Sequence, residues 1–163
     1  MSIKVGDKFP QGTLAFYESK SLKTIQIDEI LRNKRVIIFG MPGAFTPTCS
    51  QYHIPSIINQ ITNYKEKGID DIFCLVVNDI YVTSIWAEQT GATQAGLTIL
   101  SDPSGALVKK IGMSFNAPAI GFLDRSVRFC VLINNGIVEQ ILKENTTGSC
   151  DITSGENILA LLK

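Results

Sequence analysis

The residue in this sequence best suited to chemistry is Cys49, which closes the stretch VIIFGMPGAFTPTC. Residues 36–39 are apolar and mostly β-branched, a pattern typical of a strand buried on both faces of a parallel sheet. Thr46 and Pro47 predict a helix start, because a hydroxyl side chain caps a helix and proline favours its first position. We therefore expect Cys49 in the first turn of a helix that follows the carboxyl end of a central strand.

A thiol in that position is suited to nucleophilic chemistry. The unpaired backbone N–H groups and the positive end of the helix dipole both favour a thiolate. Ligands of open α/β sheets also gather at this edge of the sheet. A cysteine taken alone is most often a small buried hydrophobe, but the loop before Cys49 is rich in turn residues and hydroxyls. We therefore treat Cys49 as a candidate nucleophile.

Other strand–loop–helix chemistries lack the residues they need. A phosphate-binding loop needs a lysine, and a phosphatase-like loop needs an arginine soon after its cysteine; residues 40–57 contain neither. A dithiol motif needs a second cysteine at position 46, which is Thr46. A thiol hydrolase needs a histidine base, and the only histidine is His53, one helical turn beyond Cys49. We expect His53 to be a polar, partly exposed residue without a chemical role, and keep the hydrolase as a competing hypothesis.

The length and composition predict one domain spanning residues 1–163, because 45% hydrophobic residues are enough for a substantial core. Fifteen basic and fifteen acidic residues cancel, so neither nucleic acid nor a membrane surface is an expected partner. No segment has the apolar length of a signal peptide or a membrane span, and we expect a cytoplasmic protein. Four scattered cysteines and one histidine predict neither a disulfide scaffold nor a metal site.

The hydrophobic pattern alternates predicted strands and helices along the chain. Strands are expected over residues 13–17, 24–27, 36–39, 72–77, 98–101, 119–123, 128–133 and 137–142. Helices are expected over residues 28–32, from Thr46 to Gly68 with a kink at Pro55, after Asp79, over 106–111, and from a Thr153–Glu156 capping box to Leu162. This order predicts a thioredoxin-like three-layer sandwich, with a central mixed β-sheet flanked by helices.

The segment PGAFTPTC resembles the Pro-x-x-x-Thr-x-x-Cys motif of the peroxiredoxins. Its residues GAFTP (43–47) are similar to those of the type II, peroxiredoxin-five-like subfamily. The similarity continues through CLVVND (74–79), Trp86, SDP (101–103), Arg128-Phe129 and NGIV (135–138), so it covers nearly the whole chain. The resemblance implies a homodimer that reduces hydrogen peroxide and organic hydroperoxides without a bound cofactor. Its cysteine would cycle through a sulfenic acid and be reduced again by glutaredoxin/glutathione or thioredoxin.

The resemblance also implies a role for each residue that matches the family motif. Cys49 would be the peroxidatic nucleophile, Thr46 the hydrogen-bond partner of the peroxide, and Pro42 the residue that shields the thiolate from water. Arg128 would be the positive charge beside the sulfur. From its neighbours in sequence alone, Arg128 would instead be expected at a solvated sheet edge, and Arg125 is a second, less favoured charge partner.

The other three cysteines divide into two kinds. Cys74 and Cys130 lie in apolar strand patterns and are expected in the core. Cys150 lies in a polar loop, where atypical two-Cys members of the subfamily carry a resolving cysteine, although the spacing to the closing helix is longer here. Cys74 falls where some plant-like members have their second cysteine. A one-Cys cycle stays open, as does a redox sensor or chaperone-like dimer that uses the same Cys49.

Overall fold

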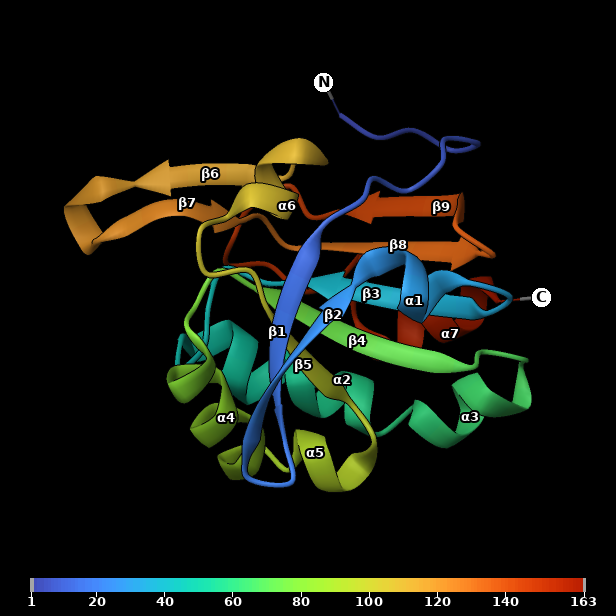
Figure 1. The fold of residues 1–163 in the computed structure, drawn as a ribbon, viewed down its shortest axis with the longest axis horizontal. Coiled ribbons are helices and arrows are strands. Elements are labelled where there is room, and N and C mark those ends of the chain that lie inside the picture. The colour runs from blue at the N-terminus through green and yellow to red at the C-terminus, as the bar shows by residue number, and fades with distance from the viewer. Residues whose placement is uncertain (1, 163) are drawn as a thin grey trace.

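A seven-stranded mixed sheet organises the fold in the computed structural model, which describes residues 2–162 (Figure 1). The strand order is β2-β1-β5-β4-β3-β8-β9. The strands are β1 (Thr13–Glu18), β2 (Ser21–Gln26), β3 (Arg35–Gly40), β4 (Asp71–Val76), β5 (Thr98–Ser101), β8 (Phe129–Asn134) and β9 (Ile137–Lys143). The three central strands β3, β4 and β5 are parallel, whereas β8, β9, β1 and β2 pair antiparallel with their neighbours.

Helices cover both faces of the sheet, which gives the predicted three layers. One face packs against α1 (Ile27–Leu31) and α6 (Ala106–Lys110). The other packs against the helical segments within residues 47–66 and against α4 (Ile80–Gln89), α5 (Ala92–Ala95) and α7 (Gly155–Leu161). The central strand β3 sends alternate side chains into the two cores, so both of its faces are buried as predicted. Within residues 2–162, no helix combines the length and the apolar character needed to cross a membrane.

The region predicted as one strand over residues 119–123 is a separate two-stranded hairpin. Strands β6 (Ser114–Ala117) and β7 (Phe122–Ser126) pair antiparallel, and a 3₁₀ turn, η2 (Pro118–Ile120), joins them. Figure 1 shows this hairpin extending beyond the main sheet. The predicted strand thus covered part of the turn and only the start of β7, so its bounds were wrong. Strand β6 was not predicted because it is short and at most half-buried, so it lacks the apolar run that marks a core strand.

The helix predicted from Thr46 to Gly68 is divided into segments. A π-helical turn, η1 (Cys49–His53), leads into α2 (Ile54–Ile58), and a break at residues 59–60 precedes α3 (Ile61–Glu66). Pro55 explains the irregularity, because its ring nitrogen cannot donate to the helical ladder and the preceding turn widens instead. Gly68, at φ 80°, follows the helix end as expected.

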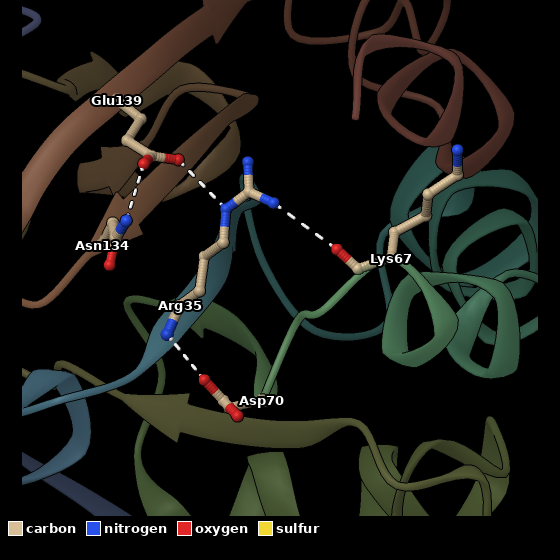
Figure 2. A network of polar contacts seen from close by, with 5 residues as sticks. All are labelled: Arg35, Lys67, Asp70, Asn134 and Glu139. Atoms are coloured by element: carbon tan, nitrogen blue, oxygen red, sulfur yellow. Dashed lines mark hydrogen bonds and ion pairs between the residues drawn. The ribbon is translucent and has the colours of Figure 1, made fainter. Parts of the chain in front are cut away.

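Arg35, the first residue of β3, lies at the centre of a polar network (Figure 2). The Arg35 backbone N–H donates to Asp70 Oδ2 at 2.7 Å, and Arg35 Nε donates to Glu139 Oε2 at 3.1 Å. Arg35 Nη1 also donates to the Lys67 carbonyl, and Asn134 Nδ2 donates to Glu139 Oε1. These contacts join β3 to β9 and to the α3–β4 connection at the start of β3, whereas Cys49 follows the end of that strand.

Candidate active site

Cys49 lies at the point where the chain turns from β3 into its helix. The helix begins at Pro47, and the Thr46 carbonyl accepts its first hydrogen bond from Ser50 N at 3.0 Å. Cys49 is therefore in the first helical turn, as predicted, and it opens the π-helical turn η1. Its side chain is completely buried. The thiol thus lies next to free backbone N–H groups and the positive end of the helix dipole.

The guanidinium of Arg128 lies beside the sulfur of Cys49. Arg128 Nη2 is 3.3 Å from Cys49 Sγ and donates to the Thr147 carbonyl at 3.0 Å. Arg128 is 1% exposed and lies between β7 and β8 rather than at a solvated sheet edge, so the expectation from its sequence neighbours alone was wrong. A buried positive charge at this distance stabilises negative charge on the sulfur.

His53 is buried and bonded, contrary to our expectation of a partly exposed residue. Its Nε2 lies 2.8 Å from the Thr153 carbonyl, which can only accept, so Nε2 carries the ring proton. Its Nδ1 then accepts from Arg128 Nη1 at 2.9 Å. Burial and the neighbouring Arg128 charge lower the pKa of His53 from 6.5 to about 3. The ring is neutral with its lone pair in use, so His53 does not fit the base of a thiol hydrolase.

The loop between β3 and the helix is held from two sides. The Pro42 carbonyl accepts from Arg125 Nη1 at 3.1 Å, and Ala44 N donates to Asn78 Oδ1 at 2.9 Å. Pro42 is buried. A side chain at Gly43 would place its Cβ 2.2 Å from Arg125 Nη1, so a larger residue here would displace the end of the Arg125 side chain. Thr46 Oγ1 donates to the Gly43 carbonyl at 2.7 Å, which leaves the oxygen lone pairs free to accept.

Arg125, the second basic residue considered from the sequence, has a different role in the structure. Its guanidinium carbon lies 4.7 Å from the centre of the Phe122 ring, and its Nη1 is used by the Pro42 carbonyl. Arg125 therefore ties the β6–β7 hairpin to the loop before Cys49. Of the two arginines, Arg128 is the one with a nitrogen at hydrogen-bond distance from the sulfur.

Cys150 lies in the loop before α7. A surface pocket is lined by Thr48 and Tyr52 of the helix and by residues 148–151 of this loop. Thr48 Oγ1 donates to the Gly148 carbonyl at 3.1 Å, which fastens the loop to the first helical turn. Cys150 is partly buried; burial raises its pKa to about 11, with Arg128 acting against that rise and Glu144 and Asp151 adding to it.

Cys74 and Cys130 lie in the core, as predicted. They occupy β4 and β8, and both pair with Phe39 of the strand between them. Burial raises the pKa of both thiols. Among residues 2–162, no three or more side chains of the metal-binding types gather into a cluster that could hold an ion.

Sequence reasoning missed two connections that complete the site. Trp86, the single tryptophan, donates from Nε1 to Ser50 Oγ at 2.9 Å, next to Cys49 in the chain. Glu144 is buried under the Cys150 loop and binds it through its carboxylate. Neither connection leaves a local signal in the sequence. Trp86 and Ser50 belong to different helical segments, and Glu144 binds a loop without regular secondary structure.

Comparison with known proteins gives these features their context. The Redoxin family model matches residues 4–159. The chain is 38% identical over 161 residues to Peroxiredoxin-2D of Arabidopsis thaliana, with 98% of each chain covered. The chain belongs to the peroxiredoxins.

Solved peroxiredoxin structures share the fold. Reduced Prx3 from Vibrio vulnificus in complex with hydrogen peroxide matches with a TM-score of 0.92 and 32% identity, covering 99% of both chains. Peroxiredoxin 5 from Alvinella pompejana matches with a TM-score of 0.84 and 25% identity, covering 97% of this chain and 96% of that one. This peroxiredoxin thus has the predicted thioredoxin-like α/β fold, and it is a thiol peroxidase, an oxidoreductase that acts on peroxide.

Proposed function

We propose that Cys49 is the peroxidatic nucleophile of this peroxiredoxin and that it reduces both hydrogen peroxide and organic hydroperoxides. The observation that carries the proposal is the 3.3 Å contact between Arg128 Nη2 and Cys49 Sγ in a fully buried site. A guanidinium there stabilises negative charge on the sulfur. Its N–H groups are also suited to stabilise negative charge as the charge moves across the breaking O–O bond.

The reaction needs few groups beyond these. The Cys49 thiolate attacks one peroxide oxygen, an S–O bond forms, and the O–O bond breaks. The departing oxygen takes a proton and leaves as water or an alcohol, while the sulfur is oxidised by two electrons to a sulfenic acid. The Thr46 hydroxyl proton is used by the Gly43 carbonyl, so the Thr46 oxygen accepts a hydrogen bond from the peroxide O–H. Pro42, buried and without an N–H, shields the sulfur from water.

An external thiol then reduces the sulfenic acid. Glutathione, glutaredoxin or thioredoxin attacks the Cys49 sulfur, water leaves, and a mixed disulfide forms that a second thiol resolves. Cys150 is our candidate for an internal resolving thiol, which would form a Cys49–Cys150 disulfide with the same release of water. The shared pocket of the Cys150 loop and the first helical turn supports this choice.

We also propose a cytoplasmic homodimer whose interface includes the loops around the active site. Exposed apolar side chains support this surface: Phe45 is 51% exposed on the loop before Cys49, and Ile120 and Leu123 are 68% and 63% exposed on the β6–β7 hairpin. The contact from Arg125 to Pro42 joins these two segments. Sedimentation of the reduced protein at micromolar concentration tests the dimer, and a clean monomer mass contradicts it.

One kinetic experiment tests the function. The protein is titrated with hydrogen peroxide and with a bulky alkyl hydroperoxide in a stopped-flow instrument. Each titration is run once with glutaredoxin and once with thioredoxin as the reductant. We expect sustained catalytic consumption with at least one reductant. Stoichiometric oxidation of Cys49 without turnover would favour the redox sensor or chaperone-like dimer, and ester hydrolysis without added reductant would favour a hydrolase.

A further inference from the structure

Glu144 is a buried carboxylate that follows β9 and stands next to the backbone of Arg128. Its N–H donates to the Arg128 carbonyl at 3.0 Å, which extends the β8–β9 pairing by one step. The residue is only 5% exposed. Burying a carboxylate costs free energy unless several hydrogen-bond donors contact it. The donors that contact Glu144 therefore indicate its role.

The partners of the Glu144 carboxylate all come from the loop that carries Cys150. Oε1 accepts from Asp151 N at 2.9 Å, from Thr153 N at 2.7 Å and from Thr153 Oγ1 at 2.9 Å. Oε2 accepts from Ser149 Oγ at 3.2 Å. The loop therefore wraps around the carboxylate. Thr153, predicted to cap the last helix, is used here instead, and Ser154 caps α7.

Two carbonyls of the same loop orient the two terminal nitrogens of Arg128. The Thr147 carbonyl accepts from Nη2, the nitrogen that contacts Cys49 Sγ. The Thr153 carbonyl accepts from His53 Nε2, and His53 Nδ1 accepts from Nη1. Arg128 Nε has no hydrogen-bond partner, so the direction of the guanidinium depends on these outer contacts.

We propose that Glu144 is a positioning residue of the peroxidase reaction. Its carboxylate fixes residues 145–153, and the fixed Thr147 and Thr153 carbonyls hold the guanidinium of Arg128 against the sulfur. Without the carboxylate, two backbone N–H groups of the loop lose their acceptor, and the loop has no regular secondary structure to retain its shape. The inference rests on the role proposed above for Arg128 and Cys49.

Glu144→Ala tests the proposal with two readouts at Cys49. We expect the rate constant with hydrogen peroxide to fall about 10- to 100-fold, because a small misplacement of a catalytic group lowers the rate by an amount of this order. We also expect the rate of Cys49 alkylation by iodoacetamide, measured at one fixed pH, to fall, because a misaligned Arg128 stabilises negative charge on the sulfur less. Glu144→Gln keeps an oxygen that can accept the three bonds of Oε1, and it should restore both readouts.

Glu139→Ala is the matched control, because Glu139 is a partly buried carboxylate within β9 that binds Arg35 and Asn134 at the far end of the sheet. It should lower stability without changing either readout.

A folded Glu144→Ala protein with parental rates overturns the proposal, as does an equal loss of rate in both alanine variants or a failure of Glu144→Gln to restore the readouts. If Glu144→Ala does not fold, Glu144→Asp, whose shorter side chain cannot reach the same donors, gives the same comparison. A parent protein unreactive toward peroxide would contradict the proposed function alone, since the alkylation rate still tests whether Glu144 positions Arg128 beside Cys49.

Discussion

His53 Nδ1 accepts a hydrogen bond from Arg128 Nη1 at 2.9 Å, and both side chains are buried. The other ring nitrogen of His53 donates to the Thr153 carbonyl, so the neutral tautomer is the one that fits. Protonation at Nδ1 would place a second positive charge against the guanidinium. The imidazole therefore serves as a neutral acceptor that directs Arg128, and its low pKa follows from burial first and from Arg128 second.

This arrangement predicts a loss of stability in acid. His53 titrates near 6.5 when unfolded and at about 3 when folded, so between these values the unfolded chain binds a proton that the native protein does not. The contribution of His53 is thus complete above pH 6.5 and is lost as the pH falls toward 3. By this linkage the free energy of unfolding should be about 2 kcal/mol lower at pH 5 than at pH 7 from His53 alone.

Urea unfolding followed by Trp86 fluorescence at the two pH values measures this difference. His53→Gln keeps a side chain that can donate and accept, and it removes the only histidine of the chain. Its stability should depend less on pH between 7 and 5. The same pH dependence in the variant and the parent would mean that His53 is not the group responsible.

Cys49→Ser should abolish peroxidase activity and leave the fold intact. Serine is nearly isosteric with cysteine, but its hydroxyl does not ionise near neutral pH. Peroxide consumption with an added thiol reductant measures the loss, and far-UV circular dichroism with Trp86 fluorescence checks the fold. Turnover well above background in the variant would remove Cys49 from its assigned role.

Local signals were enough to predict the part of the site that is continuous in sequence. The buried strand, the loop and the helix start around Cys49 follow from residues 36–49, and the structure agrees. Arg128 could not be predicted in this way, because 79 positions separate it from Cys49 and only the sheet brings them together. His53 was misplaced because its burial depends on the π-helical turn and on partners more than 70 residues away.

Thr46→Val should slow the reaction with peroxide roughly 10²-fold, the scale expected when one group that binds the transition state is lost. Valine keeps the shape of threonine and deletes the hydroxyl that contacts the Gly43 carbonyl. Thr46→Ser retains that hydroxyl and serves as the control, with a rate close to the parent. Stopped-flow oxidation measures both, and a Thr46→Val protein as fast as Thr46→Ser contradicts the role.

Arg128→Lys should also impair the reaction, because one ammonium cannot contact the sulfur, the Thr147 carbonyl and His53 with the geometry of a planar guanidinium. Arg125→Lys is the comparison, since Arg125 contacts the Pro42 carbonyl and the Phe122 ring. We expect the larger loss of rate in Arg128→Lys. The reverse order would indicate that Arg125 supplies the charge that the reaction needs.

Oxidation of Cys49 should show which second thiol, if any, can reach it. A disulfide needs the two Cα atoms within about 7 Å and side chains directed toward each other. Cys74 is held in β4 between two paired strands, so moving its backbone breaks sheet hydrogen bonds. Cys150 lies in a partly exposed loop, which opens locally at lower cost. We therefore predict that any internal disulfide joins Cys49 to Cys150, with Cys74 and Cys130 left reduced.

Peptide mapping by mass spectrometry of peroxide-treated protein under non-reducing conditions identifies the bridge. Cys150→Ser should then leave Cys49 as a sulfenic acid, or as a glutathione adduct when glutathione is added. The other two thiols, Cys74 and Cys130, are fixed within the sheet and cannot replace Cys150. Cys74→Ser is the matched control and should still form the bridge. A Cys49–Cys74 disulfide in the parent contradicts the choice of Cys150. If the parent yields only sulfenic acid or a glutathione adduct, the protein belongs to the one-Cys class. In that case the hydrogen bonds from the loop to Glu144 would hold Cys150 away from the Cys49 sulfur.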